Sequence, residues 1–169
     1  FSNLELSERF YQSYNLIKTL SFQNKDIGVL LWTNHYSYDD SFNVKFINLN
    51  LSIFGAAYKS YNNNLDYLIL KFHHRIPRPN KIQNARIKSA FKRVGINVIL
   101  FDEIFNYDSS CRIYPIEMFL DIFNISFFVG ACSSGIWNAS EKLTCRTYSA
   151  FQYENSLVGE VNYTKSKID

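Results

Sequence analysis

Four short apolar runs, each about as long as a buried strand, constrain the fold of this chain most strongly. They cover residues 27–32, 66–72, 96–101 and 126–131. Strands that are apolar on both faces are typical of parallel sheets covered by helices on each side. Segments with helical spacing follow the first three runs, at 42–61, 81–94 and 113–123. This alternation predicts an α/β fold, with a Rossmann-like parallel sheet flanked by helices.

Local signals mark the ends of several elements. Gly95 suits the C-terminal cap of the second helix, and Pro115 falls in the first turn of the third, where proline is tolerated. We expect a polar loop at 102–112, a fourth helix from near Gly135 to about Lys142, and a last strand at 144–150. The chain then divides into a lead-in helix at 1–24, a central domain at 25–153 and a polar tail at 154–169.

Composition and charge place few limits on function. The 169 residues carry a formal net charge of +3, which allows an anionic ligand or a negatively charged membrane surface and requires neither. Three cysteines, Cys111, Cys132 and Cys145, have neither disulfide nor zinc spacing, so we expect a reducing, cytoplasmic location. No apolar run approaches the ~20 residues of a membrane span. Because the chain starts at Phe1 and not at a methionine, we expect it to be either processed or a fragment of a longer protein.

The turn after the fourth apolar run is the first candidate site. In a parallel sheet, ligands bind at the carboxyl ends of the strands, near a topological switch point. Ser133 and Ser134 stand between that run and a helix start, where unpaired backbone N–H groups and the helix dipole favour an anion. We therefore predict a phosphate site there. The alternative is that the two serines only cap the helix.

A basic cluster follows the second run. Lys71, His73, His74 and Arg75 lie within five residues at a strand end, where they could neutralise a phosphate leaving group. A histidine there could also protonate it, because its pKa lies near neutrality. The alternative is that His73 only caps the strand by bonding to a backbone carbonyl. We expect no metal, because adjacent histidines point apart on an extended chain and no third ligand is evident.

Further candidates are weaker when taken alone. Glu117, at a helix start, could accept both ribose hydroxyls, or it could only complement the helix dipole. Thr33 and Asn34 follow the first run and could touch a ligand. Asp39 and Asp40 could suggest a metal ligand or a base, but adjacent acids in a loop are more often solvated. Arg78, Lys81 and Arg86 are most simply the solvated face of a helix. The chain has no GxGxxG, Walker, GxSxG or HExxH motif.

Three of these motifs, in a fixed order, carry a family resemblance. Lys71-Phe-His-His-Arg75, Tyr114-Pro-Ile-Glu117 and Gly130-Ala-Cys-Ser-Ser134 resemble the carboxyl-terminal nucleotide-binding half of bacterial sialyltransferases with the GT-B fold. The nearest groups are the lipooligosaccharide sialyltransferases of glycosyltransferase family 52 and the capsular polysialyltransferases. The resemblance implies a CMP-sialic acid donor and no cofactor. It places His73 and the two serines at the CMP phosphate and Glu117 at the ribose.

The resemblance also implies binding partners, and this chain differs from the family pattern at two points. It implies a nucleotide-sugar donor, a surface glycan acceptor (lipooligosaccharide or capsule) and an amino-terminal acceptor domain that would carry the general base. We expect no nucleic-acid partner; peripheral contact with the inner membrane face stays open.

His74 stands where the family has proline. The amino-terminal half is not recognisable in this chain. Two alternatives remain: a GT-B transferase with another nucleotide-activated donor, or a truncated, non-catalytic nucleotide-binding module.

Overall fold

The computed structural model describes residues 24–33, 42–61, 64–105, 112–119, 123–130, 136, 139–140 and 145–149. The expectations for the lead-in helix and the polar tail therefore lie outside the described residues. So do those for Asn34, Asp39, Asp40, Ser133 and Ser134.

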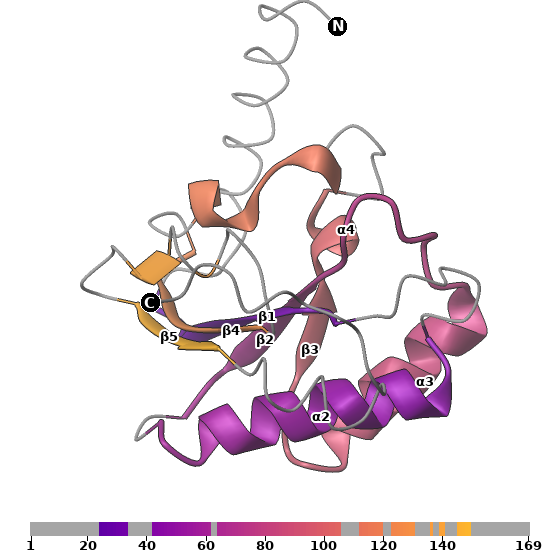
Figure 1. The fold of residues 1–169 in the computed structure, drawn as a ribbon, viewed down its shortest axis with the longest axis horizontal. Coiled ribbons are helices and arrows are strands. Elements are labelled where there is room, and N and C mark those ends of the chain that lie inside the picture. Colours follow the sequence, from indigo (N-terminus) through magenta and orange to yellow (C-terminus); the bar gives the residue numbers. More distant parts are fainter. Residues whose placement is uncertain are drawn as a thin grey trace, which may run out of the picture.

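The centre of the molecule is a sheet of five parallel strands in the order β3-β2-β1-β4-β5 (Figure 1). The strands are β1 (Ile27–Leu31), β2 (Tyr67–Lys71), β3 (Val98–Leu100), β4 (Ile125–Gly130) and β5 (Arg146–Ser149). All four pairings are parallel, including that of β5 with β4. This sheet confirms the predicted Rossmann-like α/β fold.

Helices cover both faces of the sheet. Helices α2 (Val44–Tyr58) and α3 (Lys81–Lys92) lie on one face, while α4 (Phe101–Ile104) and the 3₁₀ helix Ile116–Phe119 lie on the other (Figure 1). Successive strand residues point to opposite faces, so each strand contributes to two cores. Val29 and Ile69 pack on the α4 side.

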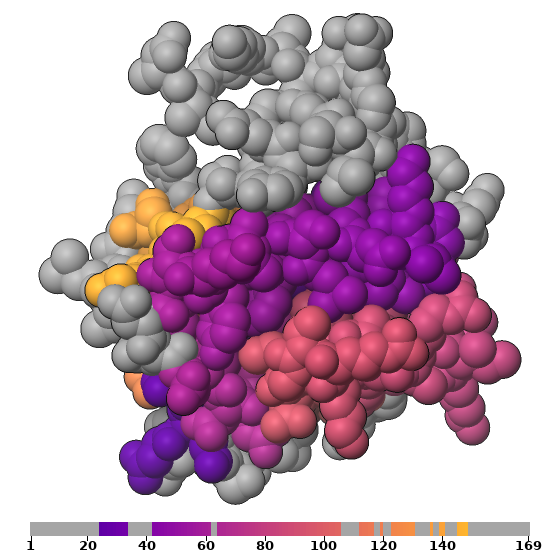
Figure 2. Space-filling model, turned by 90° about the horizontal axis from the view of Figure 1, so that it is seen from below, coloured from indigo at the N-terminus to yellow at the C-terminus, as the bar shows by residue number. Residues whose placement is uncertain are grey.

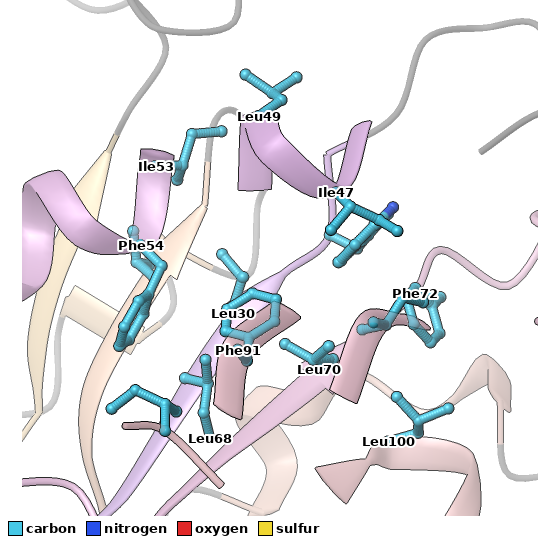
Figure 3. Close-up of a cluster of buried hydrophobic side chains, with 14 of the residues drawn as sticks. Leu30, Ile47, Leu49, Ile53, Phe54, Leu68, Leu70, Phe72, Phe91 and Leu100 are labelled. Carbon is cyan, nitrogen blue, oxygen red and sulfur yellow. The ribbon is translucent and has the colours of Figure 1, made fainter. Parts of the chain in front are cut away.

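The core beneath α2 and α3 is rich in large apolar side chains. Figure 3 shows Phe54 of α2 and Phe91 of α3 over Leu30 of β1 and Leu68 of β2. These four side chains are almost completely buried. Burying each stabilises the fold by about 1.5–3 kcal/mol.

Both long helices begin at an asparagine cap. Asn43 accepts the backbone N–H of Phe46 at the start of α2, and Asn80 forms a reciprocal capping box with Gln83 at the start of α3. Gly95, at φ +81°, follows α3, and the N–H of Ile96 returns to the carbonyl of Phe91 at 3.1 Å. This is the C-terminal cap predicted for Gly95.

Two local expectations were wrong. The segment after the third strand is not wholly a polar loop: Phe101–Ile104 is a short helix, because Phe101 and Ile104 pack into the core and Glu103 caps the N–H of Leu100. A continuous helix over 113–123 is also absent. The described part contains a 3₁₀ helix, Ile116–Phe119, which starts only after Pro115. A proline disfavours the helical conformation of the residue before it, here Tyr114.

No helix in the described ranges has both the length and the apolar character needed to cross a membrane.

Candidate anion site at the carboxyl edge of the sheet

The chain switches direction across the sheet between β1 and β4. It builds β2 and β3 on one side of β1 and then returns to place β4 and β5 on the other. The carboxyl ends of β1 and β4 therefore form the topological switch point, where α/β sheets bind ligands. The carboxyl edge also includes the end of β2, because Leu31 of β1 is paired with Lys71.

Gly130 of β4 allows β1 and β4 to lie close together at this switch point. A Cβ atom on Gly130 would lie 2.9 Å from the Cβ of Leu31 and 3.2 Å from Cδ1 of Ile136. No real side chain fits at such distances without displacement. Ser133 and Ser134 follow two residues later, after Ala131 and Cys132. They lie outside the described residues, so their phosphate-binding role stays a prediction.

The end of β1 is held by a buried asparagine that sequence reasoning missed. Asn50 of α2 accepts the N–H of Thr33 at 2.8 Å and donates to the carbonyl of Thr33, also at 2.8 Å. Its amide also donates to the carbonyl of Phe46 at 2.9 Å. Asn50 thus pairs with both polar backbone groups of Thr33, as a neighbouring strand would. The one available signal was a polar residue on the apolar face of α2.

This clamp occupies the backbone N–H of Thr33 and one of the two acceptor positions of its carbonyl oxygen. Thr33 itself is buried, with 7% of its surface exposed. Its predicted contact with a nucleotide stays untested, as does that of Asn34, which lies outside the described residues.

The basic cluster after β2 forms a tight turn. The N–H of Ile76 donates to the carbonyl of His73 at 2.9 Å, and the buried side chains of Phe72 and Ile76 anchor the turn on each side. His73, His74 and Arg75 are exposed between these anchors. The turn therefore displays three basic side chains at the carboxyl edge.

The two histidine rings lie side by side, with centroids 4.2 Å apart and planes tilted by 32°. The expectation that they point apart was wrong, because the turn replaces the extended backbone on which it rested. Among the described residues, no three His, Cys, Asp or Glu side chains gather to hold a metal.

His73 has one nitrogen in a local contact. Its Nδ1 accepts the backbone N–H of Arg75 at 3.3 Å, which places the proton of the neutral ring on Nε2. Partial burial and the neighbouring charges of His74, Arg75 and Lys71 lower the pKa of His73 below its usual 6.5. His73 is therefore mainly neutral at pH 7, with an Nε2–H group able to donate to an anion.

Lys71 is engaged on the α4 side of the sheet. Its Nζ donates to the carbonyl of Arg112 at 2.6 Å and to that of Phe72 at 3.4 Å. It also lies 4.5 Å from the ring centroid of Phe101. Direct nucleotide binding by Lys71, which stays a prediction, would weaken these contacts.

A buried carboxylate beside the turn was not predicted. Oδ2 of Asp102 accepts Nε of Arg112 at 3.0 Å and Nε of Arg78 at 3.1 Å. Arg112 also donates through Nη2 to the carbonyl of Ile76 at 2.6 Å. The interpretation of Arg78 as a solvated cation beside a helix was therefore wrong. These contacts fix the turn after β2 to the start of α4.

Glu117 lies in the 3₁₀ helix Ile116–Phe119, between the buried residues Ile116 and Phe119. The segment that leads to it is tied to the carboxyl edge through Arg112, which contacts both Lys71 and Ile76. The side chain of Glu117 lies outside the described part of the structure, so its ribose contact stays a prediction.

Comparisons of the chain with protein-family models, with curated proteins and with solved structures gave no significant match. The site is therefore interpreted from its own residues.

Proposed function

We propose that the carboxyl edge of this sheet binds the phosphate of a nucleotide-activated sugar, and that the chain is the nucleotide-binding half of a sialyltransferase-like glycosyltransferase. One observation carries the proposal. A rigid turn after β2 displays His73 and Arg75 at the same edge as the β1–β4 switch point.

The strand order supports a phosphate position over the end of β1 in this proposal. The ends of β2 and β4 flank β1, so they lie about 10 Å apart, at roughly 4.8 Å per strand. A phosphate that bridges His73 and the two serines Ser133 and Ser134, which follow β4 in the sequence, would lie over the end of β1. At that location the phosphate would also be within reach of Thr33 or Asn34, the contacts predicted from the sequence.

In this proposal His73 acts first as a hydrogen-bond donor. Its Nε2–H group faces the phosphate, and the negative charge of the ligand offsets the neighbouring cations and raises the pKa of His73. Electrostatic stabilisation then acts on the charge that develops as CMP leaves. Arg75 supplies a second cation, Ser133 and Ser134 supply donors, and Glu117 accepts the ribose hydroxyls.

The proposed reaction is a displacement at the anomeric carbon of CMP-sialic acid. The bond from that carbon to the phosphate oxygen breaks, and its electron pair leaves with CMP. The hydroxyl oxygen of a surface glycan forms the new bond. Its proton passes to a base that we assign to an acceptor domain outside this chain. The resemblance of the three motifs, rather than the fold, supports this choice of donor.

The test is a titration of CMP, UMP and CDP into the folded chain, followed by calorimetry and NMR. We expect selective CMP binding that is lost in the Ser133→Ala/Ser134→Ala variant. The matched control is Ser52→Ala/Ser89→Ala, which changes two exposed helix serines away from this edge.

Each other outcome has a defined meaning. Preference for UMP or CDP would replace the sialyltransferase proposal with a transferase that uses another donor. Binding of CMP without transfer, even when an acceptor domain is supplied, would favour a non-catalytic nucleotide-binding module. A folded chain that binds no nucleotide would refute the site.

A further inference from the structure

A long part of the chain contains no acidic residue. Residues 67 to 101 have neither Asp nor Glu, although the net charge of the whole chain is only +3. The same stretch contains eight cations: Lys71, Arg75, Arg78, Lys81, Arg86, Lys88, Lys92 and Arg93. Positive charge is therefore concentrated in one region of the molecule.

The structure places much of this charge on the outer face of the layer formed by α2 and α3, which Figure 2 shows. Neither helix contains an acidic residue. Lys88 forms a salt bridge with Glu103, with 2.7 Å between Nζ and Oε1. Five other cations are exposed and make no salt bridge with a described residue: Lys45, Lys81, Arg86, Lys92 and Arg93.

Both helices carry a lysine where their dipole disfavours one. Lys45 and Lys81 stand in the first turns of α2 and α3, and neither first turn has an acid. The positive end of a helix dipole repels a cation and favours an anion. Breaking this rule in both helices is a local cost, which an external anionic partner would offset.

Exposed aliphatic side chains lie among these cations. The described residues have four exposed large apolar side chains, and three belong to this layer: Val44 (58%), Ile82 (71%) and Val94 (58%). Val44 adjoins Lys45 and Ile82 adjoins Lys81. None of the three is aromatic, so the described part of this face lacks the exposed stacking groups used to bind nucleic-acid bases. Aliphatic groups flanked by cations suit the boundary between lipid headgroups and acyl chains.

We propose that the outer face of α2 and α3 docks onto an anionic lipid bilayer. The five cations contact the headgroups, while Val44 and Ile82 enter the boundary. Both helices follow parallel strands, so their N-terminal ends lie towards the carboxyl edge of the sheet (Figure 1). The first turns of both helices, which carry Val44, Lys45, Lys81 and Ile82, therefore lie on the side of that edge, and docking through them brings it close to the bilayer. This proposal does not depend on nucleotide binding.

The test is sedimentation of the whole chain with phosphatidylcholine vesicles that contain or lack phosphatidylserine. We expect binding only with phosphatidylserine, falling as salt rises. Each cation near an anionic surface raises the membrane partition coefficient about fivefold. Removing two of them in Arg86→Gln/Arg93→Gln should therefore weaken binding about 25-fold. Both positions are exposed, and circular dichroism checks that the variant folds.

Two matched controls separate this face from general charge and hydrophobicity. Lys25→Gln/Arg146→Gln removes the same charge elsewhere, at the half-buried Lys25, whose Nζ lies 3.7 Å from Oδ1 of Asp66, and at the exposed Arg146. This variant should weaken binding less than about threefold. Ile82→Ser should weaken binding, whereas Ile113→Ser should not, although Ile113 is 53% exposed.

Three results would overturn the proposal. They are equal binding to both kinds of vesicle, equal losses in the two charge-removing variants, and tighter binding to an RNA duplex than to the anionic vesicles. The last would assign the basic face to nucleic acid.

Discussion

The clamp between Asn50 and Thr33 predicts a large effect from one substitution, Asn50→Leu. Leucine has a similar volume but removes three hydrogen bonds of 2.8–2.9 Å. The carbonyl of Phe46 keeps its helical partner. The N–H and carbonyl of Thr33 lose theirs in a buried position. Each such unsatisfied group costs about 1–3 kcal/mol.

The expected net loss is about 3 kcal/mol of unfolding free energy. Two unsatisfied groups cost roughly 2–6 kcal/mol, and the added apolar surface of leucine offsets part of this. In a domain of this size, the melting temperature should fall by roughly 6–12 °C. Urea unfolding measures the free energy, and hydrogen exchange should show that the Thr33 amide loses protection.

Asn48→Leu is the matched control, because Asn48 lies on the same helix and is exposed. Its unfolding free energy should stay within about 0.5 kcal/mol of the parent value. If Asn50→Leu is as stable as Asn48→Leu and the Thr33 amide stays protected, the clamp does not hold the end of β1.

Three further predictions concern the carboxyl edge and its supports. Gly130→Ala should cost about 1–3 kcal/mol by forcing β1 and β4 apart, whereas Gly55→Ala, with open space around it, should be neutral or stabilising in thermal unfolding. Asp102→Ala should cost about 3–5 kcal/mol, because it leaves two paired guanidinium groups without their carboxylate; removing the exposed Asp66 should cost about 1 kcal/mol or less. NMR should give a pKa for His73 below 6.5. The folded state binds the proton of His73 less well than the unfolded state. The contribution of His73 to the free energy of unfolding should therefore be complete above about pH 6.5 and decrease as pH falls towards the folded-state pKa. Bound phosphate should raise that pKa. An unshifted titration would contradict the arrangement of the turn.

Several parts of the site were accessible from the sequence, because they depend on neighbours along the chain. The basic residues after the second strand were placed at its carboxyl end, and His73 and Arg75 are exposed there. The contacts of Lys71 were not accessible, since its partner Arg112 lies 41 residues away. Asp102 was missed for the same reason: only folding brings Arg78 and Arg112 to it.

The sequence alone determined the α/β class, the approximate positions of all five strands and the cap at Gly95, because apolar periodicity and glycine conformation act over a few residues. Tertiary structure decided the strand order, and with it the switch point between β1 and β4. It also decided that Asn50 completes the end of β1 and that a turn brings His73 beside His74. The pairing of distant strands, and which buried polar groups meet, depend on how the layers pack, and local sequence patterns do not encode that.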